Sequence, residues 1–502
     1  DKNVGIDKTV NVNGITLTGA EAGNYTLSAT TAATTADITV RPLATWIGGA
    51  SGNWSVAANW DALPDLSNVL AASVPTGKSV TFDAAAGSTN LASLTAAGLS
   101  IAGGTLNIAD SLTVDSSFSQ TGGTLSFGVG AIASIIQASG NLSLPALAVA
   151  SLSLKAPAGA ITQSGAIVTG NLITQSSAGT TLTDGGNQIA SFTATNSGSG
   201  NIALTNTGTL SIGGISNSGG NITVDNTGAV TTVGAVSAPS GSVSIVAHSP
   251  LTIGAGGVSA GGDILLTAGE TAASTDNLTL GGSVATTGSA SSVTLLADDN
   301  LVQNANVTTS GGAVTAVAQT GSISMVLGTT TSTAGGGISY TASSGNVVLT
   351  SLDARGGSIA LNTGKNIQPA LGFSGANLIG NKAVVVAGGN VNLSTQVRLL
   401  DVSVGGTISI ADLLTGSAMS DVSAATSTIS FLDQALRAVA ATTPLQPRPT
   451  TTTTPPLLPT CGDSTAQLLG GGAQTTGGAE GAFGGAAGDV GGKSLEEKKG
   501  DD

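Results

Sequence analysis

The chain is poor in the residues that globular enzymes use for chemistry and for packing. Charged residues make up 8% and aromatic residues 2% of its 502 positions, with one histidine and one cysteine, Cys461. A single cysteine excludes an internal disulfide framework. The scarcity of charge and of large aromatic side chains argues against an ordinary globular enzyme and for stacked coils of small residues.

The charge and the hydropathy of the chain disfavour two further classes of protein, nucleic-acid-binding proteins and proteins with membrane-spanning helices. The net charge is −14 and the isoelectric point about 4.2, so the chain lacks the basic footprint of a nucleic-acid-binding protein. Mean hydropathy is +0.33, yet no run approaches the ~18 apolar residues of a membrane helix, and we expect no transmembrane segment. The chain begins at Asp1 without an initiator methionine or a signal peptide, so we expect it to be part of a longer protein.

Glycine is abundant, at 74 positions, and much of it belongs to a recurring phrase of a small-residue turn followed by alternating aliphatic residues. The phrase reads GNIAL, GNITV, GSVSI and GDILL at its first four starts, which are Gly200, Gly220, Gly241 and Gly262. Later copies start at Gly312, Gly337, Gly357, Gly389 and Gly406. A period of about 20–21 residues kept over many copies is typical of a solenoid.

Each unit alternates apolar and polar residues in short runs, which predicts three short strands separated by turns. The leucine-rich repeat phrase is absent, and a propeller blade needs roughly 40 residues. We therefore predict an all-β fold, a right-handed parallel β-helix over residues 81–426. One such coil cannot bury enough apolar surface to fold alone, so stacking must stabilise it.

Two departures from plain repetition stand out within the coils. Asn201, Asn221, Asn346 and Asn390 follow turn glycines, where asparagine suits turn geometry and stacked copies predict an internal amide ladder. Two intervals are longer by about ten residues, and such insertions map to loops, often on a binding face. Gly269–Leu278 and Pro369–Gly380 are thus the surface candidates for specificity, with a neutral loop as the more common outcome.

Residues 1–43 differ from the coils, because VNVNGITLTG, NYTLS and TADITV predict three longer strands. This segment closely resembles the C-terminal half of the YDG-type repeat, a small β-sandwich module of large bacterial surface proteins. The resemblance implies a partial β-sandwich that lacks some strand partners. We expect it to leave a strand edge exposed.

All three tryptophans, Trp46, Trp54 and Trp60, lie in TWIGGASGNWSVAANWDALP, within residues 44–80. They are possible ligand contacts, because aromatic faces stack on sugars. The alternative is a cap that seals the first coils, as solenoid ends require. The segment resembles one found at the head of β-helical passengers in secreted bacterial proteins, which favours the Trp-rich cap.

The C-terminal region reads as three further segments. Residues 427–441 have the spacing of a capping helix. Residues 442–461 are rich in proline and threonine and predict an extended stalk. Residues 462–502 form a glycine-rich tail that cannot bury a core, so we expect disorder.

No arrangement of residues predicts a catalytic, cofactor-binding or metal site. The single His248 suits a turn better than a general base, and Asp298 and Asp299 are the only acidic pair within the coils. Asp225, Asp263 and Asp276 are isolated in sequence, and calcium-binding repeats are absent. We expect no enzyme activity.

Taken together, these segments resemble the distal part of a filamentous haemagglutinin-like surface protein of the two-partner secretion type. The resemblance implies an extracellular structural shaft at the bacterial outer surface, acting in cell adhesion, aggregation or biofilm formation. It implies export by an outer-membrane transporter partner, and a glycan or protein on a host or bacterial surface as ligand. The alternative is a secreted β-helix polysaccharide lyase or hydrolase.

Overall fold

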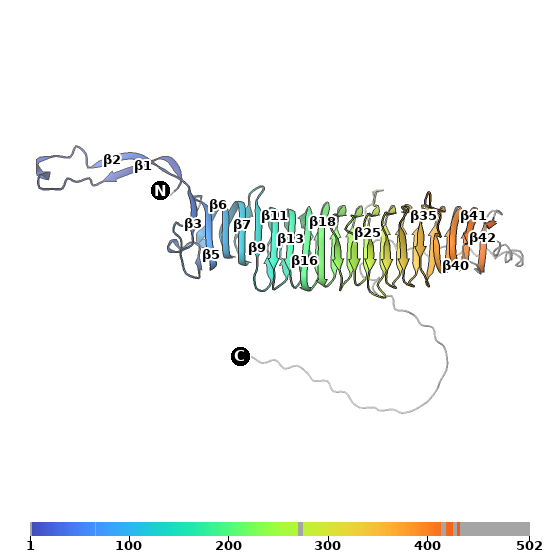
Figure 1. The fold of residues 1–502 in the computed structure, drawn as a ribbon. Helices are drawn as coiled ribbons and strands as arrows, with labels where there is room; N and C mark the ends of the chain where they lie inside the picture. Colours follow the sequence, from blue (N-terminus) through green and yellow to red (C-terminus); the bar gives the residue numbers. More distant parts are fainter. Residues whose placement is uncertain (1–2, 66, 270–274, 413–417, 425–428, 432–502) are drawn as a thin grey trace, which may run out of the picture. The chain divides into compact units, whose positions relative to one another are not determined.

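The computed structural model describes residues 3–65, 67–269, 275–412, 418–424 and 429–431. The strands from β3 to β43 form one parallel hydrogen-bonded system of 41 strands, a β-solenoid of about 16 turns (Figure 1). At ~4.8 Å per turn the coil stack is roughly 75 Å long. The prediction of a parallel β-helix is confirmed.

Each regular coil contains three strands, and each strand pairs in register with its equivalent in the next coil, so that three stacks form. We call them sheets A, B and C. Sheet A contains β10 (Leu142–Leu144), β12 (Ile161–Gln163), β14 (Thr180–Leu182), β17 (Ile202–Asn206), β19 (Ile222–Asn226), β22 (Val243–Ala247), β25 (Ile264–Ala268), β28 (Val293–Ala297), β31 (Val314–Ala318), β34 (Ile338–Ala342) and β37 (Ser358–Thr363). Sheet B contains β8 (Thr124–Phe127), β15 (Gln188–Ile189), β20 (Val230–Thr232), β23 (Leu251–Ile253), β26 (Leu278–Leu280), β29 (Leu301–Gln303), β32 (Ile323–Met325), β35 (Val347–Leu349) and β38 (Ile367–Pro369). Sheet C contains β9 (Ile132–Ile136), β16 (Ser191–Ser199), β21 (Val236–Ala238), β24 (Val258–Ala260), β27 (Val284–Thr286), β30 (Val307–Thr309), β33 (Thr330–Thr333) and β36 (Ser351–Asp353).

Longer strands turn a corner and contribute to more than one sheet. They are β5 (Val69–Phe82), β6 (Ser88–Ile101), β7 (Thr105–Gln120), β11 (Leu147–Ala156), β13 (Ile167–Ser176), β18 (Leu210–Gly219), β39 (Leu378–Ala387) and β40 (Val391–Val404). The stack begins with β3 (Arg41–Thr45) and β4 (Ser51–Asn53), and ends with β41 (Ile408–Asp412), β42 (Ala418–Ala424) and β43 (Ile429–Phe431).

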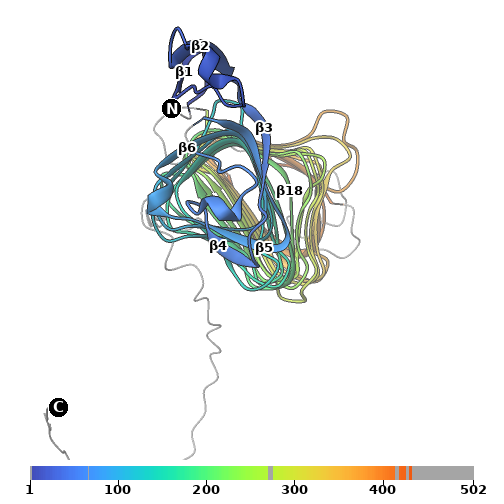
Figure 2. The same ribbon diagram turned by 90° about the vertical axis from the view of Figure 1, so that its left-hand side faces the viewer.

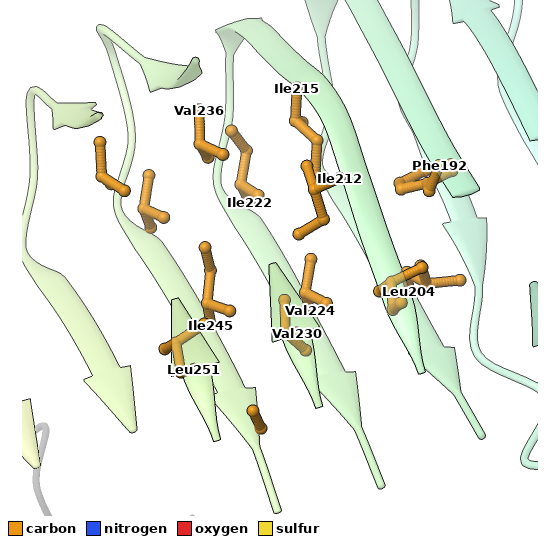
Figure 3. Packing of buried hydrophobic residues seen from close by; sticks show 14 of the residues in the cluster. Phe192, Leu204, Ile212, Ile215, Ile222, Val224, Val230, Val236, Ile245 and Leu251 are labelled. Atoms are coloured by element: carbon orange, nitrogen blue, oxygen red, sulfur yellow. The ribbon is translucent and has the colours of Figure 1, made fainter. Parts of the chain in front are cut away.

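Strict alternation along the strands places aliphatic side chains inside the coils. In β19 and β22 every second residue is buried, and the buried residues of neighbouring coils face each other in register, as Leu204, Val224 and Ile245 do (Figure 3). The same aliphatic position is therefore repeated from coil to coil. This stacking buries side chains that a single coil would leave exposed.

Glycine at the turns is required both by backbone conformation and by the close spacing of the coils. Gly200 and Gly208 both have positive φ, +98° and +92°. A Cβ on Gly200 would lie 2.2 Å from the carbonyl oxygen of Ala178 in the preceding coil, whereas one on Gly208 would meet nothing within 4 Å.

Alanine substitutions at these two glycines separate the cost of backbone strain from the cost of a clash with the neighbouring coil. We expect Gly208→Ala to lower the free energy of unfolding by about 1 kcal/mol, the cost of a left-handed alanine. Gly200→Ala should cost about 2–4 kcal/mol, because the clash adds to that strain. Urea unfolding of both variants measures the difference; equal losses would show that coil spacing does not constrain Gly200.

The second insertion lies within the predicted range Pro369–Gly380, although the repeat alignment from which it was predicted was wrong. The phrase at Gly389 does not continue the series that contains Gly357, because Val391 pairs with Ile367 in sheet B, whereas Ile359 pairs with Ala383 in sheet A. All three sheets use the same turn-and-alternation pattern, so the sequence cannot tell which sheet a phrase belongs to. The second insertion is consequently shorter than expected and lies at 370–377, between β38 and β39.

The N-terminal segment forms a two-stranded antiparallel sheet, β1 (Gly5–Asn13) with β2 (Thr31–Ile38). The second predicted strand, NYTLS, is not formed; the 3-10 turn η1 (Ala22–Asn24) includes its first residue, and Tyr25 is 71% exposed. Nearly every residue of β1 and β2 is exposed, so this hairpin has no core of its own. Within the described residues each of the two strands has a single partner, which leaves the expected free edge.

The C-terminal predictions fall mostly outside the described residues. Of the helix expected at 427–441, the structure describes residues 429–431, which form β43 and pair with β41. Residues 429–431 are therefore not helical, and the rest of the predicted helix lies outside the described residues. The stalk at 442–461, with Cys461, and the tail at 462–502 lie outside the described part of the chain.

Candidate functional site

The three tryptophans are packed together at the first coil. Trp54 lies 4.7 Å from Trp60 and 5.2 Å from Phe82, and Trp46 meets Trp60 edge-on at 5.2 Å, all between ring centroids. Their exposed fractions are 0–3%. Each indole N–H donates to a carbonyl oxygen within the same segment: Trp46 to Gly49, Trp54 to Pro64 and Trp60 to Trp54.

This geometry corrects the sugar-platform interpretation of Trp46, Trp54 and Trp60. Their faces are covered by one another and by Phe82, so none is presented to solvent. The segment instead closes the first coil, with 3-10 turn η2 (Ala57–Asn59) folding back so that Trp46 and Trp60 form an antiparallel bridge. The cap interpretation is the one that the burial supports.

A hollow of about 310 Å³ lies beside the cap. Trp54, Leu63 and Pro64 supply apolar lining, and Ser55 and Asp65 supply polar groups. Ala85 and Ala86, from the 3-10 turn η3 (Ala84–Ala86), also line it. The Ser55 hydroxyl is engaged by Asp83 of the next coil at 2.7 Å, so the polar groups here already serve to join coils.

The first insertion brings carboxylates together that are separate in sequence. Residues 270–274 lie outside the described residues, but a Cβ on Gly269 would lie 2.4 Å from Cβ of Asp298 and 3.4 Å from Cβ of Asp276. Asp276 is 1% exposed, and its carbonyl accepts the backbone N–H of Asp299. The acidic residues of successive coils thus gather at the corner that joins sheet A to sheet B.

The second insertion presents apolar groups at a different corner. Leu371 is 99% exposed on the loop at 370–377, which joins sheet B to sheet C. The loop is anchored by Asn377, which is 1% exposed and donates to the carbonyl oxygens of Leu349 and Thr350. Its base is therefore fixed while its tip is open to solvent.

His248 and Asp225 form a pair that sequence reasoning missed. His248 Nε2 lies 2.8 Å from Asp225 Oδ1 across adjacent coils. The side chains are 28% and 51% exposed, so the pair is solvent-screened and its contribution to stability is small. The coil register would have revealed it, since Asp225 pairs with Val246, two residues before His248.

The asparagines form ladders of two kinds. Asn201 and Asn221 are exposed, and each Oδ1 accepts a backbone N–H of the following coil at 2.9 Å. Asn346 and Asn390 belong to a second outer ladder, at the start of sheet B. The prediction of an internal amide ladder is therefore wrong for these four asparagines: they lie on the outside of the turns, where their side-chain oxygens accept backbone N–H groups of the next coil.

A second set of asparagines, not recognised from the sequence, lies fully inside the coils. Its members are Asn187, Asn196, Asn206, Asn217 and Asn226, all 0% exposed. Within this set Asn196 donates to Asn217 and Asn206 to Asn226, each at 2.8 Å. For four of the five, all except Asn187, the sequence signal is Asn-x-Gly at a strand end, as in NSG and NTG.

Tyr340 links all three sheets across three successive coils. Its hydroxyl lies 2.7 Å from Oε1 of Gln303 in sheet B and 2.6 Å from Oγ1 of Thr331 in sheet C. Burial raises the pKa of the Tyr340 phenol well above its usual range, against the opposing effect of the Thr331 hydrogen bond. The neutral phenol is the form that the fold holds.

This raised pKa predicts a loss of stability at high pH. An unfolded tyrosine ionises near pH ~10, so the contribution is fully present below that pH and declines as pH rises through it. Tyr340→Phe should cost about 1–2 kcal/mol near neutral pH and lessen the alkaline decline. Urea midpoints at about pH 8 and pH 11 test this, with Tyr25→Phe as the exposed control; the same alkaline decline in wild type and Tyr340→Phe would contradict it.

The described residues contain no group of three His, Cys, Asp or Glu side chains placed to hold a metal ion. No helix in the described part of the chain is long and apolar enough to span a membrane.

The fold defines the class: this chain is a parallel β-solenoid repeat protein preceded by a β-hairpin segment. Residues 1–35 match the YDG domain family, which agrees with the resemblance found in the sequence. No curated protein and no solved structure matches the chain.

Proposed function

We propose that the chain is the structural shaft of an extracellular adhesin, similar to the filamentous haemagglutinin-like proteins. The observation that carries the proposal is the continuous coil stack, whose interior is filled by aliphatic and hydrogen-bonded polar side chains. A solenoid of this kind sets a fixed distance between its ends. The YDG match at residues 1–35 is compatible with such a surface protein.

On this proposal the protein acts at the bacterial outer surface in adhesion, aggregation or biofilm formation. A separate outer-membrane transporter exports it, and a glycan or protein of a host or bacterial surface is its ligand. Treatment of intact producing cells with a broad-specificity protease tests the location. Loss of the protein from intact cells is the expected result; protection until lysis would refute a surface location.

Deletion of one coil tests whether the coils serve as a structural shaft. Removal of residues 243–263 places Ile264 where Val243 was, Leu278 where Leu251 was and Val284 where Val258 was, so all three sheets keep their register. We expect the variant to fold and, when displayed on beads, to bind cells as the wild type does. Complete loss of binding in a folded variant would place the function in the removed coil.

An activity assay distinguishes the shaft from the alternative, a polysaccharide lyase or hydrolase. For a structural shaft, incubation with plant and bacterial polysaccharides should release no new reducing or unsaturated ends. Release that disappears in Asp276→Asn or Asp298→Asn would establish an enzyme at the first insertion. Asp225→Asn, at an exposed position beside His248, is the matched control.

A further inference from the structure

A series of side-chain acceptors runs along the turns that join sheet C to sheet A, and we call it the sheet A ladder. In each of these coils the side chain directly before sheet A accepts the backbone N–H of the equivalent residue in the next coil, at 2.8–3.3 Å. Its consecutive members are Asn201, Asn221, Ser242, Asp263 and Ser292. Figure 2 looks along the stack and shows the turns of successive coils gathered at its corners.

The sheet A ladder stops at Ala313. The Ser292 hydroxyl accepts the N–H of Ala313, but neither Ala313 nor its equivalent in the next coil, Gly337, carries a side-chain acceptor. The N–H groups of Gly337 and Ser358 therefore lack the side-chain partner that their counterparts have. Within the described residues, the N–H of Gly337 has no backbone acceptor either. The outer ladder of sheet B, by contrast, is unbroken from Asn277 to Thr407.

A hollow of about 360 Å³ lies where the sheet A ladder is missing. It is lined by the residues that directly precede the buried face of sheet A in four successive coils, Ala313, Gly337, Ser358 and Lys382. It is also lined by outward-facing residues of the same four strands, Thr315, Ser339, Ala360 and Val384. The hollow crosses three coil steps, so it extends about 14 Å along the stack. Its size is in the range of small-molecule and saccharide sites.

Cationic side chains lie at the end of the hollow that is nearer the C-terminus. Lys382 is the one charged residue that lines it. Arg398 lies at the same corner in the next coil, since Lys382 pairs with Leu399. Arg355 lies at this corner in the preceding coil, in the turn before β37, and its side chain is 70% exposed. Three successive coils thus each place a cation at this corner.

The sign of the charge along the stack changes at this place. From residue 355 to residue 398 every charged residue is basic, whereas at 156–354 the charged residues other than His248 are acidic. Two acidic residues flank the cations: Asp353 pairs with Arg355 at 3.7 Å, and Asp401 lies one coil beyond Val384. Neither lines the hollow. An anion is therefore attracted to these coils and repelled from the coils that precede them.

The chemistry of the lining restricts the ligand. Backbone N–H groups at the edge of a sheet form anion-binding concavities, and a carboxylate accepts charge-assisted hydrogen bonds from an ammonium and from N–H groups. The hydroxyls of Thr315, Ser339 and Ser358 stand beside small apolar groups, and a sugar ring likewise presents hydroxyls beside C–H groups. The length of the hollow suits a chain of such rings better than a single small anion.

From the interrupted ladder, the hollow and its cations, we propose that this site binds a segment of acidic polysaccharide. A uronate carboxylate lies against Lys382 and the N–H of Ser358, and a further ligand oxygen accepts the N–H of Gly337. The inference rests on the adhesin function proposed above, whose ligand it names as an acidic glycan. One charged contact in an open hollow makes each site weak, and many shafts on one cell strengthen the binding by multivalency.

Repair of the ladder tests the site by filling it. Gly337→Asn supplies an acceptor for the N–H of Ser358 and occupies the hollow. The substitution is compatible with the backbone, because φ at Gly337 is not in the left-handed region and a Cβ there would come no closer than 3.5 Å to another group, the carbonyl oxygen of Ser358. The variant should keep or raise the urea midpoint and bind oligogalacturonate at least about tenfold more weakly in calorimetry of the full chain.

Gly185→Asn is the control for an added asparagine, since a Cβ on Gly185 would meet nothing within 4 Å and the residue is exposed. It should bind oligogalacturonate as the wild type does. A folded Gly337→Asn variant with wild-type affinity, or a wild type that does not bind oligogalacturonate, would overturn the proposal.

A second pair of variants separates the site from general attraction to positive charge. Lys382→Ala should weaken oligogalacturonate binding at least about tenfold, whereas Lys365→Ala, at an exposed turn between sheets A and B, should leave it unchanged. The methyl-esterified oligomer, which lacks the carboxylate charge, should also bind at least about tenfold more weakly. Equal losses in the two lysine variants would show attraction by charge alone, and polyglutamate that bound as tightly as the saccharide would indicate an acidic-peptide site; either result would refute the proposal.

These measurements use purified protein, so their failure is distinguishable from failure of the shaft function. Residues 243–263, which the one-coil deletion removes, contain none of the residues that line the hollow. The protease and deletion experiments therefore decide the surface location and the shaft, whatever the hollow binds.

Discussion

Asn196→Ala is expected to lower the free energy of unfolding by about 3–5 kcal/mol, because it strips several buried groups of their partners at once. Asn196 Oδ1 accepts from Ser176 and from the backbone N–H of Gly179. Its Nδ2 donates to backbone carbonyls and to Asn217 of the next coil. The position is 0% exposed, so these groups are not solvated by bulk water when the side chain is removed.

Asn201→Ala is the matched control, because Asn201 is exposed and its side chain accepts one coil-to-coil bond, from Asn221. It should cost about 0.5–1 kcal/mol. Urea unfolding followed by circular dichroism measures both variants. If the two asparagine variants lost the same stability, the internal ladder would contribute no more than the external one.

Trp54→Ala is expected to cost about 3–5 kcal/mol, the usual range for removing a buried aromatic residue. The loss combines packing against Trp60 and Phe82 with the hydrogen bond to Pro64. The first coil has a neighbour on one side only, so its melting should precede that of the rest. Fluorescence of the two remaining tryptophans should therefore shift at lower temperature than the circular dichroism signal.

Val56→Ala provides the comparison, since Val56 is in the same segment and 44% exposed. It should change stability by less than about 0.5 kcal/mol. A Trp54→Ala variant that melts like Val56→Ala would contradict the cap role. The three tryptophans would then need a role other than stabilising the first coil.

The fold was predictable because its governing pattern is local. Alternation with period 2 and a turn glycine every 20–21 residues specify a strand and its face at each position, as in Ile222 and Val224. The sheet that a phrase joins depends on how many residues each corner uses, and this is not local. For that reason Gly389 was assigned to the wrong series.

The candidate sites were less predictable because they depend on contacts between coils. Tryptophan has both an apolar body and a donor group, and Trp54 in sequence does not reveal whether Pro64 or a ligand receives its N–H. Asn196 and Asn201 are likewise the same residue type near a turn, yet one faces the interior and the other faces solvent. The pairing of His248 with Asp225 emerges only after the coils are aligned.

The absence of lysine and arginine between Lys155 and Arg355 has a consequence for proteolysis. A trypsin-like protease has no cleavage site at residues 156–354, even in the unfolded chain. Resistance of this segment to trypsin is therefore a property of its composition and gives no measure of folding. A protease that cuts only at aromatic residues would report on folding, because Phe192 and Tyr340 become accessible only when the coils open.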